Sequence, residues 1–313
     1  MEKFLTKTYV VVALCLVCCT LWGSAIPVIK LGYSEMHIND TDIAAQILSA
    51  GIRFFVAGIL TVIIGTIISK KPVYPKSGAS FFRAVKLSLF QTIIQYVFFY
   101  IALANTTGVK ASILDGTSVF IALFVSGLIF KMERITSLKI LGSVIGFIGV
   151  FLININTDNV ETLFDFSLMG EGFIILSTIG YACSSVFMKR YSTYDDTTML
   201  SGYQFIIGGL VMTVAGFAFG GRLEELSVKA VLIIVYLAFV SAVAYTIWAQ
   251  LLKYNPVSRV AVFGFLTPIL GSVFSMLILG ETGAFGLKGL VSLILVSAGI
   301  ILVNTNFKKK KHE

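Results

Sequence analysis

The most constraining feature of this chain is a series of long apolar segments joined by short polar connections. Ten of them can be marked, at roughly 8–30, 47–69, 82–104, 110–130, 136–154, 169–189, 198–219, 229–252, 259–279 and 286–304. Each approaches or exceeds the roughly 20 residues that a helix needs to cross a bilayer. None alternates apolar and polar residues, and the backbone must bond to itself in hydrocarbon, so helices are expected. The pattern predicts an all-α membrane protein with ten transmembrane helices.

Composition excludes the other broad classes of protein. The chain is 57% apolar and 13% charged, whereas soluble domains are about 45–50% apolar and about 25% charged. Its four cysteines all lie in apolar segments, where we expect buried, unpaired thiols. The two histidines, His37 and His312, lie outside those segments, and no metal-ligand or phosphate-loop motif is present. We therefore expect no enzyme activity, no cofactor or metal, and no nucleic-acid partner.

The basic residues predict the orientation of the chain. With the N-terminus in the cytoplasm, 18 of the 24 lysines and arginines fall on the cytoplasmic side and 6 on the external side. Such a bias in short loops is typical of membrane topology. An even number of spans then places both termini in the cytoplasm, and the Lys308–Lys311 tail suits anionic lipid there.

The chain also repeats itself. At a spacing of 148 residues, Gly116 aligns with Gly264 and Glu133 with Glu281, and the run 149–154 resembles 299–304. We therefore expect two five-helix repeats at 1–154 and 169–304, an external linker at 155–168 and a basic tail at 305–313. Because five spans is an odd number, the second repeat must be inverted, an architecture that places a substrate site between the halves.

Short motifs in this order resemble the drug/metabolite transporter superfamily, EamA type. They include Trp22-Gly23-Ser24, Arg53-Phe54, Thr267-Pro268 and Leu279-Gly280-Glu281. The resemblance covers nearly the whole chain and implies ten helices as five plus five. It also implies export of small metabolites or amino acids, driven by an ion or substrate gradient. Phe120 stands where the second half has Pro268, so a break in the helix is expected only in the second half.

Two charged residues within or beside apolar segments are candidates for function. Asp115 lies five residues into its segment, and ionisable groups at such positions are commonly functional. We interpret it as a proton-coupling residue; the alternatives are a wet position near the outer interface or pairing with Lys110 or Arg53. Arg53 opens its segment and could bind a substrate carboxylate, or it could be a snorkelling or structural arginine.

Polar and aromatic residues at helical spacing are candidates for lining the pathway. Buried amides and hydroxyls can bind a polar metabolite while aromatic rings cover its apolar part. Polar contacts between helices are the alternative for the amides and hydroxyls, and a simple helix kink is the alternative for the proline. The candidates are Trp22, Gln91, Gln95, Tyr96, Tyr100, Tyr181, Tyr245, Trp248 and Pro268. Glu133 and Glu281 are interpreted as structural.

Taken together, the sequence predicts a secondary transporter of the plasma or inner membrane. Small polar metabolites, amino acids first, are the expected substrates, with export as the expected direction and a proton or counter-substrate as the coupling partner. An importer of a vitamin or nucleotide-like compound is one alternative, and a non-transporting membrane subunit is another. Association into a homodimer is left open.

Overall fold

The computed structural model describes residues 2–39, 41–106, 108–154, 166–223, 226–280 and 287–305, and regular structure within these ranges is helical throughout. The α-helices are α1 (Glu2–Leu5), α2 (Thr8–Glu35), α3 (Ile43–Ser69), α4 (Gly78–Ser88), α5 (Gln95–Leu103), α6 (Gly108–Gly116), α7 (Ser118–Phe124), α8 (Ser137–Asn154), α9 (Phe173–Tyr191), α10 (Thr197–Ala218), α11 (Val228–Tyr254), α12 (Val257–Ala261), α13 (Leu266–Leu279) and α14 (Leu287–Thr305). Three π-helical segments, η1 (Leu89–Ile94), η2 (Val125–Ile129) and η4 (Leu168–Gly172), and the 3₁₀ segment η5 (Val262–Phe265) extend them.

Most of the predicted apolar segments become spanning helices. Over the ranges given above, nine helical stretches are long and apolar enough to cross a membrane. The predicted segment 110–130 forms a shorter apolar stretch at Ile113–Ile129. The predicted linker 155–168 lies outside the described residues apart from its last three positions, and so does the tail 305–313 apart from Thr305. Glu281 also lies outside them.

Polar side chains begin several of the helices. Asp42 accepts a hydrogen bond from the backbone N–H of Ala45 at 2.9 Å, and Ser77 accepts one from Ser80 at 3.1 Å. Asp196 caps the start of α10 in the same way. These caps satisfy N–H groups that the first helical turn leaves without a partner. The helix ends are therefore set locally, by residues just outside the apolar segments.

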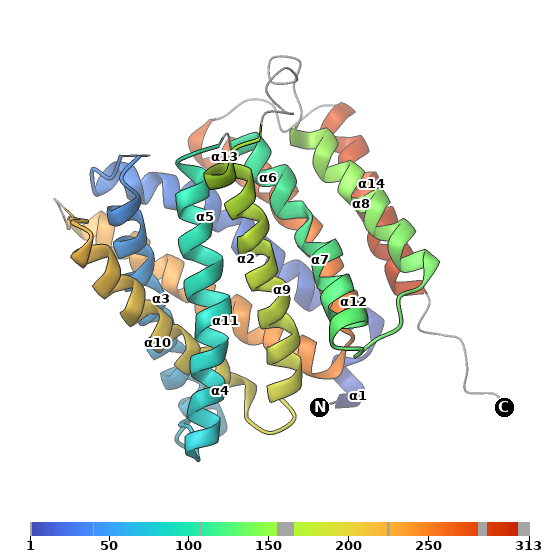
Figure 1. Ribbon diagram of the computed structural model, residues 1–313, viewed down its shortest axis with the longest axis horizontal. Helices are drawn as coiled ribbons and strands as arrows, with labels where there is room; N and C mark the ends of the chain where they lie inside the picture. The colour runs from blue at the N-terminus through green and yellow to red at the C-terminus, as the bar shows by residue number, and fades with distance from the viewer. Residues whose placement is uncertain are drawn as a thin grey trace.

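The helices form one bundle whose two edges are paired helices (Figure 1). Helices α3 and α10 pack along each other at one edge, and α8 and α14 at the other. Between these edges, α2 packs against α11 and α13, and α9 packs against α5 and α7. The first half of the chain is thus interleaved with the second half throughout the bundle.

Glycines allow the edge pairs to approach closely. A Cβ atom on Gly209 would lie 2.3 Å from the backbone nitrogen of Phe55, and one on Gly51 would lie 2.4 Å from that of Thr213. At the other edge, a Cβ on Gly299 would lie 2.5 Å from the carbonyl oxygen of Gly142. Membrane helices associate through such small residues because lipid provides no hydrophobic drive between them.

Two segments are interrupted within the bundle, one in each half. Helix α6 ends at Gly116, and α7 begins after Thr117. In the second half η5 separates α12 from α13, and Pro268, in the first turn of α13, has no N–H to donate to the Gly264 carbonyl. The prediction of a break in the second half alone was wrong, because Thr117 interrupts the first half without proline. The two interrupted segments meet, since α7 packs against α12 and η5.

Both ends of the described chain lie at the same end of the bundle (Figure 1). The Arg259 guanidinium donates to Thr8 Oγ1 at 3.1 Å and to the Thr6 carbonyl at 3.3 Å, which are near the N-terminus. Its Nε donates to Asn304 Oδ1 at 3.1 Å, near the end of α14. One buried arginine therefore joins the two ends of the chain.

Candidate functional site

Four aromatic residues from three helices meet in the interior of the bundle. The Trp22 ring of α2 packs edge-on against Tyr245 and Trp248 of α11, with ring centroids 5.1 Å and 4.9 Å apart. The Tyr96 hydroxyl on α5 lies 2.6 Å from the Tyr245 hydroxyl. Tyr245 and Trp248 thus share a helical face, as their spacing predicts. We call these four residues the aromatic cluster.

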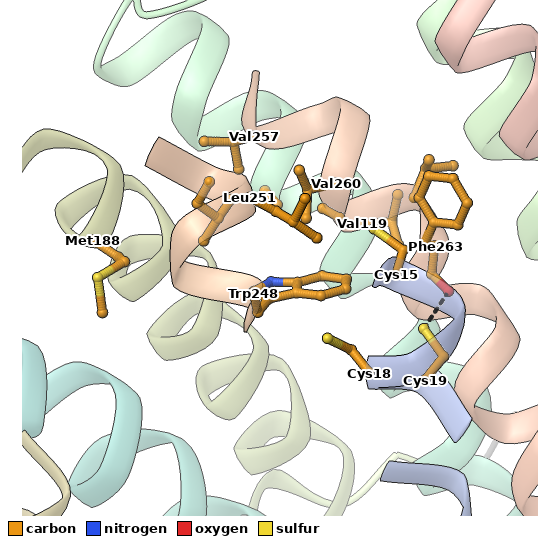
Figure 2. Close-up of a cluster of buried hydrophobic side chains, with 14 of the residues drawn as sticks. Cys15, Cys18, Cys19, Val119, Met188, Trp248, Leu251, Val257, Val260 and Phe263 are labelled. Atoms are coloured by element: carbon orange, nitrogen blue, oxygen red, sulfur yellow. Dashed lines mark hydrogen bonds between the residues drawn. The ribbon is translucent and has the colours of Figure 1, made fainter. Parts of the chain in front are cut away.

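The thiols of α2 lie beside this cluster (Figure 2). Trp248 is nearly fully buried, near Cys15, Cys18 and Cys19. The Cys19 thiol donates to the Phe263 carbonyl at 3.2 Å, and the Cys18 thiol donates to the Ala244 carbonyl at 3.4 Å. All four cysteines of the chain are free, which confirms the predicted unpaired thiols. Cys15, Cys18 and Cys19 are buried and pack α2 against its neighbours, whereas Cys183, on α9, is only half-buried.

Arg53 lies deep in the bundle rather than at its surface. Helix α3 begins at Ile43, about three turns before Arg53, and the residue is only 7% exposed. Its guanidinium carbon lies 4.4 Å from the Phe54 ring centroid and 6.0 Å from that of Tyr96. It forms no salt bridge with any residue of the described ranges, and its Nε has no hydrogen-bond partner. The snorkelling alternative is therefore wrong, because the charge is buried beside aromatic rings.

A small pocket adjoins Arg53. Its walls come from α2, α3, α5 and α11, and are lined by Ile29, Gly32, Tyr33, Met36, Ser49, Ala50, Arg53, Tyr100, Ile234 and Leu237. Its volume is about 10 Å³, which is roughly the space that one water molecule occupies. A metabolite can reach Arg53 here only if these helices separate.

Several interior polar groups have no hydrogen-bond partner. They include the indole nitrogens of Trp22 and Trp248 and the Oε1 atoms of Gln91 and Gln95. Most buried polar groups in proteins are satisfied, and each orphan costs about 1–3 kcal/mol. The orphaned donors and acceptors lie on α2, α5 and α11, which carry the aromatic cluster, and on η1, which leads into α5. Bound water or a bound polar molecule would satisfy them.

Asp115, in the interrupted segment of the first half, lies near two tyrosines of the interior. It is the second-last residue of α6, its side chain is exposed, and it interacts electrostatically with Tyr96 and Tyr181. Tyr181 lies on α9, which packs against α11, the helix that carries Trp248. No ion pair joins Asp115 to Arg53, so that predicted alternative is wrong. The side chain of Lys110, the other predicted partner, lies outside the described residues.

The remaining candidates are less directly joined to the cluster. Tyr100 lines the small pocket and its ring centroid lies 6.3 Å from that of Tyr96. Pro268 is half-buried, and its carbonyl accepts a hydrogen bond from Ser272 Oγ at 2.9 Å. Beside it, a Cβ on Gly264 would meet no atom within 4 Å, so there is open space at this helix interruption.

Glu133 forms a polar joint between the two halves. Its carboxylate accepts hydrogen bonds from Ser126 Oγ at 2.6 Å, Lys139 Nζ at 2.5 Å and the Ser258 backbone N–H at 3.0 Å, and also from Ser258 Oγ. Burial would raise the pKa of Glu133, but the hydrogen bonds from Lys139, Ser126 and Ser258 hold it below its ordinary value. The sequence shows the nearby Lys139, but no sequence signal identifies the distant Ser258.

The sequence of the chain matches that of a known protein family. The sequence profile of the EamA-like transporter family matches residues 10–155 and again residues 168–305. The chain belongs to the EamA-like transporter family. It is therefore a multi-pass protein of the cell membrane, and the members of this family are transporters rather than enzymes. The match covers nearly the whole chain, as the resemblance of its motifs implies.

Individual relatives of this EamA-like chain are distant. A transporter of Archaeoglobus fulgidus described as uncharacterized is 27% identical over 98% of this chain and 99% of its own length. A probable amino-acid metabolite efflux pump of Salmonella typhimurium is 21% identical over 95% of this chain and 96% of its own. A WAT1-related chloroplast protein of Arabidopsis thaliana is 28% identical over 64% of this chain. The match covers about half (49%) of the length of that relative.

A solved structure shares the fold of this EamA-like chain. It superimposes with a TM-score of 0.76 over 96% of this chain and 98% of that chain, at 14% sequence identity. Similarity at this level of identity concerns the fold alone.

Proposed function

We propose that this protein is a secondary active transporter that exports small polar metabolites by alternating access. Amino acids or related compounds are the favoured substrates, a class that the name of the Salmonella relative also carries. The observation that carries the proposal is the buried, unpaired Arg53 beside an interior aromatic cluster whose neighbouring polar groups lack partners. Charged and polar groups inside a membrane protein are energetically costly, and they commonly mark a binding site or a transport pathway.

The proposed architecture is ten spans arranged as two inverted repeats, 1–154 and 169–304, with both termini in the cytoplasm. Two findings support it: the family profile matches twice, and helix packing is preserved when the halves are exchanged. When each helix is replaced by its counterpart in the other half, the contact between α2 and α11 becomes the contact of α9 with η1 and α5. In the same way, the contact between α2 and α13 becomes the contact between α9 and α7. The edge pairs α3–α10 and α8–α14 map onto themselves.

In this proposal Arg53 binds a carboxylate of the substrate. A guanidinium presents a planar set of donors that fits a carboxylate, and here its charge has no acidic partner in the described part of the chain. The aromatic cluster, Gln91, Gln95, Tyr100 and Tyr181 would cover the rest of the molecule, and the interruption at Pro268 would allow movement. Because the pocket at Arg53 is small, binding requires the helices around it to separate.

The hydrogen bonds of Glu133 to Ser258, the Glu133 joint, would act at a different stage of the transport cycle from substrate binding at Arg53. The joint connects the first half of the chain to Ser258 at the start of α12, in the second half. Alternating access moves one half against the other, so these hydrogen bonds must break or rearrange when this end of the bundle opens. The joint would therefore stabilise the conformation in which this end is closed.

Asp115 is the proposed coupling residue. Asp115→Asn keeps the size of the side chain but removes the proton site, so substrate efflux should lose its dependence on a proton gradient while substrate binding persists. Efflux from proteoliposomes with and without a pH gradient measures this, with Glu35→Gln, which removes a half-buried acid paired to the exposed Lys229, as the matched control. Gradient-dependent efflux that survives in the Asp115 variant would disprove the proton role.

The first test of transport is untargeted mass spectrometry of medium and cell extract, with and without induced expression. A metabolite that rises outside and falls inside supports export and identifies the substrate, whereas the reverse shift supports the alternative of an importer. Expression of Arg53→Gln should abolish the shift. If no compound changes in either direction, export by this protein is contradicted under those conditions, and a non-transporting membrane subunit becomes the better description.

Cysteine labelling tests alternating access directly. Gln95→Cys and Tyr245→Cys, each introduced after the four native cysteines are replaced, should react with impermeant thiol reagents added from either side of the membrane. Only a pathway that opens alternately exposes both positions to both faces. Labelling from one side alone would favour the subunit alternative, since such a protein needs no through-path. A homodimer is a separate proposal, which cross-linking in native membranes can test.

A further inference from the structure

A groove of about 400 Å³ lies on the outer face of the bundle between α4 and α9. It is separate from the aromatic cluster and is lined by Phe82, Arg83, Val85, Lys86, Leu89, Phe90 and Tyr191. Phe82 is 74% exposed and Leu89 is also exposed, so an apolar rim faces outward. In a membrane protein such a rim faces lipid.

Two of the lining residues, Phe90 and Tyr191, pack against a third aromatic ring, that of Phe187, which does not itself line the groove. The Phe187 ring packs against Phe90 and stacks on Tyr191, with centroid distances of 5.1 Å and 5.7 Å. The Lys86 ammonium lies 4.7 Å from the Phe187 ring centroid. This contact is a cation–π interaction, and it restrains the ammonium beside the groove that Lys86 helps to line. Lys86 makes no salt bridge within the described residues.

Arg83 supplies the second positive charge, three residues before Lys86 on α4. It donates from one nitrogen to Asp195 Oδ2 at 2.7 Å and lies 4.7 Å from the Tyr194 ring centroid. A guanidinium has five N–H donors, so donors remain after that bond is made. Asp195 and the ring hold the arginine side chain in position at the rim.

The surrounding chain is strongly basic. Residues 70–90 hold five lysines and arginines and no acid, and residues 187–196 hold two basic residues against two acids. Together these two stretches hold seven basic residues and two acidic ones. This excess favours a ligand with net negative charge, while the exposed Phe82 and Leu89 favour one with a hydrocarbon chain. A phospholipid has both properties.

We propose that the α4–α9 groove binds an anionic phospholipid, with its headgroup phosphate at Lys86 and Arg83 and an acyl chain along Phe82 and Leu89. Basic pockets between transmembrane helices at the membrane surface bind anionic headgroups in this way. The predicted topology places this end at the cytoplasmic face, where anionic lipids are most abundant. The site is independent of the transport proposal, because it lies outside the pathway.

Native mass spectrometry of the purified full chain tests the site. The protein is titrated with phosphatidylglycerol and phosphatidylcholine that carry identical palmitoyl and oleoyl chains. We expect tighter binding of phosphatidylglycerol, and Lys86→Gln should weaken it about fivefold, as expected for the loss of one basic residue near a lipid surface. Phosphatidylcholine binding should not change.

The control is Lys229→Gln, which removes another exposed lysine that is paired with Glu35. Lys86 is itself exposed, and an unchanged elution profile and melting temperature would show that its variant folds. Soluble glycerol phosphate should compete weakly, because it lacks the acyl chain. Equal affinity of the wild-type protein for the two lipids, or equal losses in the Lys86 and Lys229 variants, would overturn the proposal. So would full competition by glycerol phosphate, which would indicate a simple phosphate site.

Discussion

Replacing Glu133 with alanine should lower the stability of this protein by about 3–5 kcal/mol. Lys139 is only 4% exposed, and Glu133 is its salt-bridge partner at 2.5 Å. Without the carboxylate, a buried ammonium would lose the negative charge that Glu133 places beside it, Ser258 would lose an acceptor, and Ser126 would keep only the Leu123 carbonyl as acceptor. Unfolding of the purified protein by SDS, followed by tryptophan fluorescence, measures the change.

Two matched variants separate the causes of this loss. Glu133→Gln retains an acceptor oxygen but not the charge, so its stability should fall between those of the wild type and the alanine variant. Glu35→Gln removes an exposed ion pair with Lys229, and exposed pairs contribute only about 0–1 kcal/mol. If the Glu133 and Glu35 variants lost equal stability, the joint would not be the strong contact that its geometry indicates.

The joint should also make stability depend on pH. Hydrogen bonds hold the pKa of Glu133 below its ordinary value of 4.5. A group whose pKa is lowered by folding stabilises the folded state above its unfolded pKa, and that contribution disappears as the pH falls through the folded pKa. The stability difference between wild type and Glu133→Gln should therefore be full near pH 7 and narrow below about pH 4.5. Melting temperatures across this range would show it, and a constant difference would contradict it.

A single methyl group at Gly209 should be nearly as damaging. The Cβ of Gly209→Ala would lie 2.3 Å from the Phe55 nitrogen and 2.7 Å from its Cα, which are backbone atoms that cannot rotate away. Helices α3 and α10 would have to separate, and overpacking of this kind costs about 1–3 kcal/mol or more. We expect lower yield from the membrane and a clearly lower melting temperature in detergent.

Gly78→Ala is the matched control for this substitution. A Cβ on Gly78 meets no atom within 4 Å, and the residue lies in the first turn of α4. The same methyl group should therefore leave the melting temperature unchanged or raise it slightly, since alanine favours helix. If the two variants behaved alike, close packing between α3 and α10 would not limit the stability of the bundle.

Arg53 and Thr117 illustrate the limits of prediction from this sequence. From the sequence, this span is expected to start at about residue 47, with Arg53 near its beginning, whereas the Asp42 cap starts α3 at Ile43, ten residues before Arg53. That shift buries the charge. The break at Thr117 was missed because no proline marks it, and hydropathy does not record a change in backbone geometry within an apolar run.

The sequence by itself determined that this is a helical membrane protein, and it located most of the spans. These properties follow from each residue's own transfer free energy into lipid and from periodicity along one helix. It also placed Tyr245 and Trp248 on one helical face. Only the tertiary structure decided that Trp22 and Tyr96 meet them, that Arg53 has no acidic partner among the described residues, and that Glu133 reaches Ser258. Those contacts depend on which helices become neighbours, and shape and close packing between distant segments decide that.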